Sequence, residues 1–461
     1  MDRIKGFFRQ KLESEDYQPL AEESFADDAN TAVECSSLLQ DGRDEVPFSW
    51  LEYGIFALLG MAMLWAWNMF LAAAPYFQMR FQSDVWITQN FQSAILTVST
   101  ITNLGAMAIL TSMQAKASYP YRINLALVIN TAIFILLTAS TSLWLDVSPS
   151  VYLGFLLVMV AGTAYAAGLI QNGAFAFAAS FGRPEYMQAL MAGQGVAGVL
   201  PALAQIFSVL AVPVRQGPGA GAGDDEEAKD STSAFIYFLT AVAISLISLV
   251  AFVPLINRHD RIVESRAMAS SLASITSTEM RRRRVGFLTL LSKLRWLSAA
   301  VALCFAASMF FPVFTGKILS VRGAATDAPR LLQPAAFIPL AFFMWNAGDL
   351  AGRMATALPF SLRHRPPMLL AIAAARLTFL PMYLLCNIGG RGAAVSSDFF
   401  YLVIVQFLFG LSNGWLGASC MMASGEWVDE SEREVAGGFM GLCLVAGLAT
   451  GSVLSFSVAS I

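Results

Sequence analysis

The chain has 461 residues, of which 56% are hydrophobic and 13% are charged, with a formal net charge of −3. A soluble domain has about 25% charged residues, so this composition excludes a fold with one water-facing surface around a single core. Lipid must therefore be the solvent for much of the chain.

The chain begins with a polar segment. Residues 1–50 are rich in Asp, Glu, Ser and Gln, and we expect a disordered, acidic cytoplasmic tail because they have little apolar surface to bury. Within the tail, Glu34 followed by Leu38 and Leu39 resembles an acidic dileucine sorting signal. Such short patterns are common by chance. If the signal is used, it binds a sorting adaptor and favours delivery to a vacuole or lysosome.

Eleven apolar runs follow the tail, each near the roughly 20 residues that a membrane-spanning helix needs. They cover residues 53–76, 88–112, 121–144, 152–178, 188–212, 234–255, 297–315, 337–358, 367–386, 399–422 and 435–457. Their lengths and near absence of charge make buried helices of a large soluble protein the weaker interpretation. The sequence predicts an all-α polytopic membrane protein with about eleven transmembrane helices.

The runs fall into two sets. Residues 51–256 hold six of them and residues 297–461 hold five, and the basic segment 257–296 lies between. We predict a six-helix bundle, a cytoplasmic linker and a five-helix bundle, an arrangement in which carriers rock about a site at the membrane midplane. The linker is expected to contact anionic lipid headgroups. A phosphorylation switch in its Ser/Thr-rich part is an alternative role.

The distribution of Lys and Arg predicts the orientation. With the N-terminus in the cytoplasm, the cytoplasmic loops and adjoining span ends hold 20 of these residues and the opposite side holds seven, while Arg353 and Arg376 lie deeper inside predicted spans. Loops rich in Lys and Arg resist translocation. We therefore expect a cytoplasmic N-terminus and, with an odd number of spans, an extracellular or lumenal C-terminus.

Ionisable side chains inside a span are functional candidates, because each costs roughly 2.5 to 3.5 kcal/mol to insert. Asn346, Asp349 and Arg353 are separated by three and four residues, so a helix places them on one face, which must point inward. A carboxylate beside a guanidinium suits the vicinal hydroxyls of a sugar. A purely structural ion pair within the bundle is the alternative.

Amide and aromatic side chains form a second group of candidates. Gln171 and Asn172 lie at midplane depth in the fourth run, and Gln194 lies in the fifth. An amide has donor and acceptor edges that match a purine or pyrimidine, although bonds between helices are its more common use in membranes. Trp67 lies too deep in the first run for an interfacial anchor, and its ring is suited to stacking on a flat base.

Five sequence blocks occur in order from the first run to the tenth. They are Trp67-Asn68 with Tyr76-Phe77, residues 184–198, Asn346-x-x-Asp349-x-x-Gly352-Arg353, residues 376–381 with Cys386-Asn387, and Ser412-Asn413-Gly414. Together they resemble the signature blocks of the equilibrative nucleoside transporter family (solute carrier family 29), in particular its fungal and protist members. The resemblance covers about residues 53–457.

The resemblance implies a major-facilitator-like architecture with one helix fewer than usual, and facilitated passage of nucleosides such as adenosine and uridine, with nucleobases as a further option. By position, it implies that Gln171 contacts the base and that the ion pair binds or gates near the ribose. The residues expected to bind or line the substrate site are Leu64, Trp67, Leu71, Gln171, Phe311, Asn346, Asp349 and Arg353. Two departures from the family, Ala66 for a proline and Trp415 for a tyrosine, bear on helix bending and pore width.

Two other functions are weighed against nucleoside transport. A carrier of a sugar or another small polar solute is the alternative, but the even twelve-span pattern and the loop motif of the wider major facilitator class are missing. An intramembrane protease needs ligands such as His-Glu-x-x-His, or a serine with a base, and the sequence has neither. We expect no enzyme activity, cofactor, metal site or nucleic-acid partner. The vacuolar, lysosomal and plasma membranes all stay open.

Overall fold

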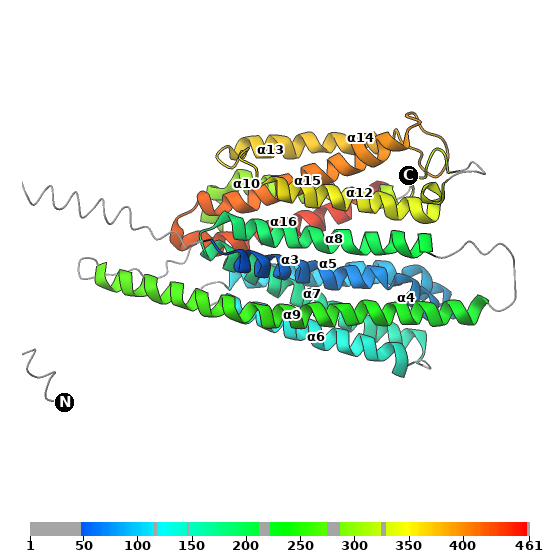
Figure 1. Cartoon of the computed structure of the whole chain (residues 1–461), viewed down its shortest axis with the longest axis horizontal. Coiled ribbons are helices and arrows are strands. Elements are labelled where there is room, and N and C mark those ends of the chain that lie inside the picture. The colour runs from blue at the N-terminus through cyan, green and yellow to red at the C-terminus, as the bar shows by residue number, and fades with distance from the viewer. Residues whose placement is uncertain are drawn as a thin grey trace, which may run out of the picture. The chain divides into compact units, whose positions relative to one another are not determined.

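A computed structural model of the chain describes residues 48–113, 118–144, 147–211, 222–273, 286–323 and 329–458. These residues are almost entirely helical (Figure 1). Apart from one isolated bridge between Ile318 and Ile388, no strand occurs among them. The all-α prediction is confirmed. Most of the predicted tail, including Glu34, Leu38 and Leu39, lies outside the described residues.

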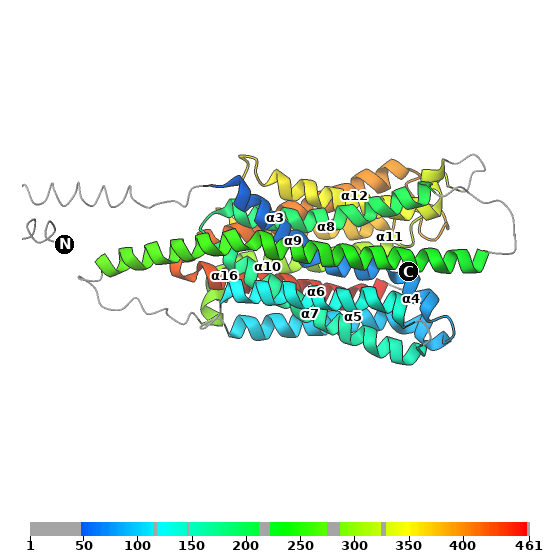
Figure 2. The same cartoon turned by 60° about the horizontal axis from the view of Figure 1, so that its bottom comes forward.

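The helices are long and run alongside one another (Figures 1 and 2). Those of the first half, residues 48–273, are α3 (Trp50–Ala72), α4 (Ala74–Arg80), α5 (Val85–Ser112), α6 (Tyr119–Leu143), α7 (Pro149–Ser180), α8 (Pro184–Ala211) and α9 (Ala222–Ala273). Those of the second half, residues 286–458, are α10 (Phe287–Ser308), α11 (Phe310–Thr315), η2 (Arg330–Leu332), α12 (Pro334–Ala355), α13 (Pro366–Ala375), η3 (Arg376–Thr378), α14 (Phe379–Tyr383), η4 (Phe400–Phe407), α15 (Leu408–Ala423), η5 (Ser424–Glu426), η6 (Glu430–Glu432), α16 (Arg433–Ser455) and η7 (Phe456–Val458).

Ten stretches of helix within the described residues are long and apolar enough to cross a membrane. The one predicted span that is missing from these ten is residues 337–358, which corresponds to α12. The 22 residues of α12 are long enough to cross a membrane. This helix carries Asn346, Asp349 and Arg353 within its length. The polytopic helical fold is therefore confirmed, with eleven as an approximate count.

The predicted linker is largely helical in its described parts. α9 continues to Ala273 and α10 begins at Phe287, so helix covers both ends of the segment 257–296 that we expected to be a loop. Hydropathy falls after residue 255 because the apolar run ends, but α9 continues as a helix beyond that point. Residues 255–285 contain no glycine or proline, so nothing in that part of the sequence forces α9 to stop.

Each half has its own helix pairs, and a few helices connect the halves. In the first half α3 packs on α8 and α9, and α7 packs on α5 and α6. In the second half α12 packs on α15, and α10 packs on α16 and α13. The halves meet where α8 packs on α12 and where α7 packs on α16.

Three helices of the second half change geometry partway along their length. α10 stops at Ser308 and α11 resumes at Phe310, two residues before Pro312, whose missing N–H removes one helical hydrogen bond. η3 separates α13 from α14. η4 is a π-helix of eight residues that leads into α15. π-helical turns are rare and are frequent at functional sites.

Glycines bring α12 and α15 into backbone contact. A Cβ placed on Gly414 would lie 1.8 Å from the carbonyl oxygen of Asp349, and one placed on Gly352 would lie 2.1 Å from that of Leu411. No other residue type fits at these two positions without moving a helix. The close approach carries Asn413 of α15 to the polar face of α12.

Candidate functional site

The side chains of Asp349 and Arg353 form an ion pair one helical turn apart on α12. Arg353 Nε lies 2.7 Å from Asp349 Oδ2, and each residue is 4% exposed. The sequence predicted this pairing from the four-residue spacing. Two charges this deeply buried require further partners, since leaving either one unpaired carries a large desolvation penalty.

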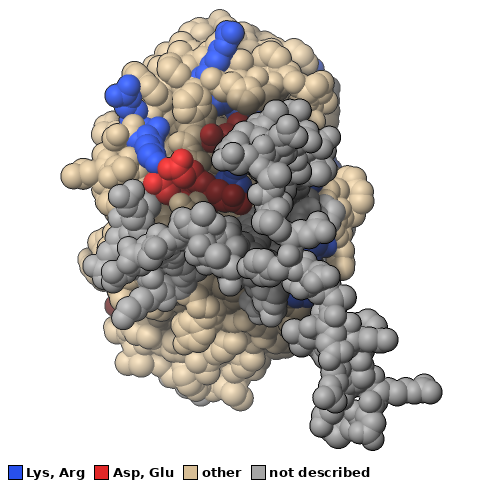
Figure 3. Space-filling view, turned by 90° about the vertical axis from the view of Figure 1, so that its left-hand side faces the viewer, with Lys and Arg blue, Asp and Glu red and all other residues tan. Residues whose placement is uncertain are grey.

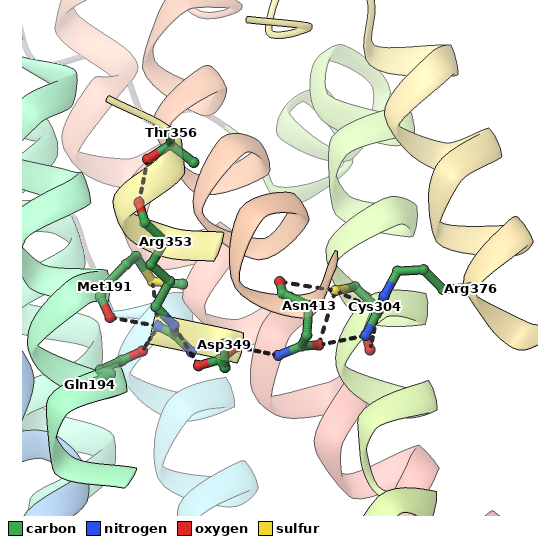
Figure 4. Close-up of polar contacts among 8 residues, drawn as sticks. All are labelled: Met191, Gln194, Cys304, Asp349, Arg353, Thr356, Arg376 and Asn413. Carbon is green, nitrogen blue, oxygen red and sulfur yellow. Dashed lines mark hydrogen bonds and ion pairs between the residues drawn. The ribbon is translucent and has the colours of Figure 1, made fainter. Parts of the chain in front are cut away.

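Arg353 finds those partners on the other half of the chain. Its Nη1 donates to the carbonyl oxygen of Met191 at 2.7 Å and to Gln194 Oε1 at 3.0 Å, both on α8 (Figure 4). In the same region Gln188 Nε2 donates to the carbonyl oxygen of Arg353 at 3.3 Å. The ion pair therefore holds α12 against α8.

Asp349 connects to the interior of the second half. Its Oδ1 accepts a hydrogen bond from Asn413 Nδ2 at 2.8 Å, and Asn413 Oδ1 accepts one from Arg376 Nη2 at 3.0 Å. Arg376 also donates to the carbonyl oxygen of Cys304 at 3.0 Å and, through Nε, to Ser412 Oγ at 2.9 Å. Figure 4 shows the contacts that join Asp349 of α12, Asn413 of α15, Cys304 of α10 and Arg376 of η3.

We call Gln194, Cys304, Asp349, Arg353, Arg376 and Asn413 the buried polar network. It contains two arginines and one carboxylate, and Arg376 touches that carboxylate only through Asn413. The Arg376 guanidinium also lies 4.9 Å from the centre of the Phe409 ring, a cation–π contact. Sequence reasoning noted Arg376, Gln194 and Asn413 within family blocks without assigning them to the site.

Asn346 lies on the same face of α12, one turn from Asp349. Its Nδ2 donates to the carbonyl oxygen of Phe342 at 2.8 Å, within its own helix. A Cβ placed on Gly198 of α8 would lie 2.4 Å from Asn346 Oδ1, so the two residues are in close contact. Asn346 thus stands where the halves meet.

The two amides of α7 have different environments. Asn172 is completely buried and accepts a hydrogen bond from Arg122 of α6, and its Nδ2 donates to Thr111 Oγ1 at 3.2 Å. Gln171 is 5% exposed, and its Oε1 has no hydrogen-bond partner among the described residues. The amide of Asn172 is therefore used in contacts between helices, whereas Gln171 Oε1 can still accept a hydrogen bond.

The apolar candidates occupy three different settings. Trp67 lines a small pocket between α3, α5 and α7. Leu64 is half-buried, and Leu71, near the end of α3, is 53% exposed. Phe311 stacks on Trp345 with the ring centres 4.1 Å apart and the planes 3° from parallel. Phe311 therefore packs within the core of the second half.

The family profile described as "Nucleoside transporter" matches residues 157–460, a stretch that includes the whole buried polar network. The chain belongs to the nucleoside transporter family. The fold and the five sequence blocks agree with this membership.

Curated relatives match the transporter over most of its length. Nucleoside transporter FUN26 of Saccharomyces cerevisiae is 27% identical over 457 residues, covering 88% of this chain and 83% of the relative. Equilibrative nucleoside transporter 1 of Homo sapiens is 24% identical over 469 residues, covering 90% of this chain and 97% of the relative.

Solved structures with a similar fold are major facilitator transporters. The proton:xylose symporter XylE superposes on the transporter with a TM-score of 0.57 at 13% identity, covering 87% of each chain. FucP in the outward conformation gives a TM-score of 0.52 at 13% identity, covering 88% of this chain and 96% of FucP. At this identity the likeness concerns the fold alone, and it confirms the expected major-facilitator-like architecture.

Proposed function

We propose that this transporter moves nucleosides across a membrane by facilitated transport, with a substrate site between the two halves that opens alternately to each side. The observation that carries the proposal is the contact of Arg353 with α8. The residue that pairs with Asp349 on α12 also holds the opposite half of the chain through Met191 and Gln194. A substrate that engages this ion pair therefore acts on the contact between the halves.

Alternating access requires contacts between the halves that form in one state and break in the other. The contacts of Arg353 suit this role because its acceptors on α8 are a backbone carbonyl and a neutral amide. A hydrogen bond from a charged donor contributes about 1.5 to 3 kcal/mol net, and substrate hydroxyls can replace these acceptors because hydroxyl oxygens accept from the same guanidinium. The bond to Asp349 keeps the guanidinium neutralised during the exchange.

The proposed pose places the ribose at the ion pair and the base at Gln171. Each carboxylate oxygen of Asp349 accepts one hydrogen bond from a described residue, and a carboxylate has about four acceptor sites, so sites remain for ribose hydroxyls. Gln171 Oε1 offers the base an acceptor. Leu64, Trp67, Leu71, Phe311 and Asn346 are proposed as the surrounding wall. Free nucleobases lack the ribose contacts and are proposed as weaker substrates.

We also propose a cytoplasmic N-terminus and an extracellular or lumenal C-terminus, with residence in a vacuolar, lysosomal or plasma membrane. The excess of Lys and Arg in the predicted cytoplasmic loops supports this orientation. Figure 3 looks onto the corresponding end of the molecule, where Lys and Arg lie beside Asp and Glu. Ion pairs there join separate segments: Lys293 Nζ with Glu432 at 2.6 Å, and Arg363 with Glu426 at 2.6 Å.

Uptake into proteoliposomes tests the function. Radiolabelled adenosine or uridine should enter with saturable kinetics, and excess unlabelled nucleoside should compete. Arg353→Ala and Asp349→Ala should lower uptake at least tenfold with protein still inserted, since each leaves a buried charge unpaired. Arg261→Ala, which removes an exposed side chain on α9, is the matched control.

Each outcome has a distinct meaning. Normal flux in both network variants would contradict the proposed site while leaving the function intact. Uptake of a hexose without any nucleoside would contradict the function and favour the sugar-carrier alternative. Substrate recovered chemically unchanged after transport is expected, because the proposal includes no covalent step.

A further inference from the structure

Three side-chain oxygens on α5 and α7 are buried and accept no hydrogen bond from any described residue. They are Asn103 Oδ1 on α5, and Thr163 Oγ1 and Gln171 Oε1 on α7. α5 and α7 pack against each other (Figure 2). Leaving such atoms without a donor is costly, and in folded proteins each one calls for an explanation.

Two of these oxygens lie along one strip of α7. Thr163, Ala167 and Gln171 are spaced by four residues, so they share one face of α7. Asn103 Oδ1 lies beside this strip, because a Cβ placed on Gly168, the residue that follows Ala167, would lie 3.4 Å from it. Asn103 of α5 therefore lies beside the face of α7 that carries Gln171.

One end of the strip opens into the pocket that Trp67 lines. Ser99, one turn before Asn103, lines that pocket together with Thr163 and Ala167. Gln171 and Thr163 are only 5% and 6% exposed. An aromatic ring at one end and unpaired amide oxygens beside it form a surface suited to a flat ligand with hydrogen-bond donors on its edge.

The unpaired oxygens of Asn103 and Gln171 determine which kind of chemical group could bind them. Asn103 Oδ1 and Gln171 Oε1 are acceptors, so the group that completes them must be an N–H or O–H donor. Adenine, at C6, and cytosine, at C4, carry an exocyclic amino group with two donors. Uracil and hypoxanthine carry a carbonyl oxygen at the corresponding position, which would face an amide oxygen without a proton between them.

We propose that Asn103 acts with Gln171 as a specificity-determining pair that selects nucleosides whose base carries an exocyclic amino group. This inference rests on the proposed function, because it assumes that a nucleoside base reaches Gln171. Asn103 supplies one acceptor from α5 and Gln171 supplies the other from α7. The neighbouring Asn172 takes no part, since Arg122 and Thr111 already occupy its amide.

Substrate pairs that differ at this one group provide the test. Proteoliposome uptake is measured for cytidine against uridine and for adenosine against inosine, in the wild type and in Asn103→Leu. The wild type should favour cytidine and adenosine. Asn103→Leu should reduce that preference about fivefold through a higher KM for the amino nucleosides, as expected for one lost hydrogen bond. Uridine uptake should persist.

Two further variants keep the test decisive. Asn90→Leu is the matched control, because Asn90 lies on the same helix and its Nδ2 already donates to the carbonyl oxygen of Trp86 at 2.8 Å. It should leave every ratio unchanged. If Asn103→Leu does not insert, Asn103→Met removes the same acceptor with a side chain that adapts to irregular space.

The outcomes separate this inference from the one on which it rests. Unchanged cytidine-to-uridine and adenosine-to-inosine ratios in the inserted Asn103 variant, with wild-type uptake intact, overturn the specificity pair alone. An equal decrease in the maximal rate for all four nucleosides, with unchanged KM ratios, indicates a structural role and also overturns it. Absence of any nucleoside uptake by the wild type overturns the proposed function itself.

Discussion

Asn413 connects two charged groups that do not touch each other. Its Nδ2 donates to Asp349 Oδ1 at 2.8 Å, and its Oδ1 accepts from Arg376 Nη2 at 3.0 Å, with the residue 1% exposed. The amide has a donor and an acceptor on one planar group, whereas an ionised carboxylate only accepts and a hydroxyl uses one atom for both roles, so neither can make the same pair of bonds with fixed roles.

Replacement of Asn413 by leucine should therefore impair transport. Asn413→Leu leaves an acceptor of Asp349 and a donor of Arg376 unpaired at once, each at a cost of about 1 to 3 kcal/mol, and we expect at least a tenfold decrease in nucleoside uptake. Uptake per inserted molecule in proteoliposomes measures the effect. Full activity in Asn413→Leu would show that the buried polar network does not depend on this bridge.

The sequence indicated which side chains take part in the buried polar network better than it indicated the atoms to which they bond. The four-residue spacing was sufficient for the pairing of Asp349 with Arg353. It could not indicate the carbonyl oxygen of Met191, because every residue has a carbonyl and sequence carries no mark of which one faces a distant guanidinium. Asn172 is hydrogen-bonded and Gln171 Oε1 is not, because Arg122 of α6 points toward Asn172. Hydropathy contains no information on how α6 is rotated about its axis.

Among the helices, the pairing of α12 with α15 depends on glycine at several positions of contact. A Cβ placed on Gly414 would lie 1.8 Å from the carbonyl oxygen of Asp349, so the helix axes cannot stay at their present separation with a larger residue. The same contact sets the distance between Asn413 and Asp349. A change in the separation of α12 and α15 therefore also changes the geometry of the buried polar network.

Gly414→Ala should lower thermal stability and uptake together. Overpacking of a close helix contact costs about 1 to 3 kcal/mol, and separation of the helices stretches the bond between Asn413 and Asp349. The melting temperature of the detergent-purified protein and its transport rate are the two measurements. Gly154→Ala on α7, where a Cβ meets no atom within 4 Å, is the control and should leave the melting temperature unchanged or raise it.

A second polar cluster joins the altered segments of the second half. Gln406 in the π-helix η4 is completely buried, accepts a hydrogen bond from Tyr383 at 3.0 Å, and donates to Tyr401 at 2.8 Å and Thr315 at 2.7 Å. Gln406→Leu leaves three hydroxyls without this partner. We expect a loss of a few kcal/mol in stability, read as a lower melting temperature. An unchanged value would show that the hydroxyls find other partners.

Sequence patterns located the helices well and their interruptions poorly. Apolar runs of about 20 residues identify spans because the bilayer sets their length. The change at Ser308 to Phe310 and the π-helix η4 leave apolar composition unaltered, so hydropathy has no means of detecting them. α12 shows the reverse case, since its polar residues lower the hydropathy by which a span is recognised.

For the molecule as a whole, the contact of α8 with α12 determines whether the two halves can rearrange. A Cβ placed on Gly195 of α8 would lie 3.2 Å from Leu350 Cβ on α12, a few tenths of an ångström below the usual separation in a disulfide. A cysteine pair at these positions would link the halves covalently next to Arg353.

Oxidation of the variant Gly195→Cys with Leu350→Cys should stop transport, and reduction should restore it, because a rigid bond prevents the halves from separating along this seam. Nucleoside uptake before and after treatment with oxidant and reductant provides the measurement. The single variant Gly195→Cys should not respond to the oxidant. Full transport by the crosslinked protein would contradict alternating access at this interface.

The length of α9 has a mechanical consequence. Its 52 residues span about 78 Å as a continuous helix, well beyond the thickness of a bilayer, and Figures 1 and 2 show one end projecting past the neighbouring helices. If this helix turns about its middle as one body, each tip moves by about 0.7 Å for every degree of tilt. A rotation of the first half by about five degrees therefore moves the tip by several ångströms. A fluorophore attached there would report the conformational cycle from outside the membrane.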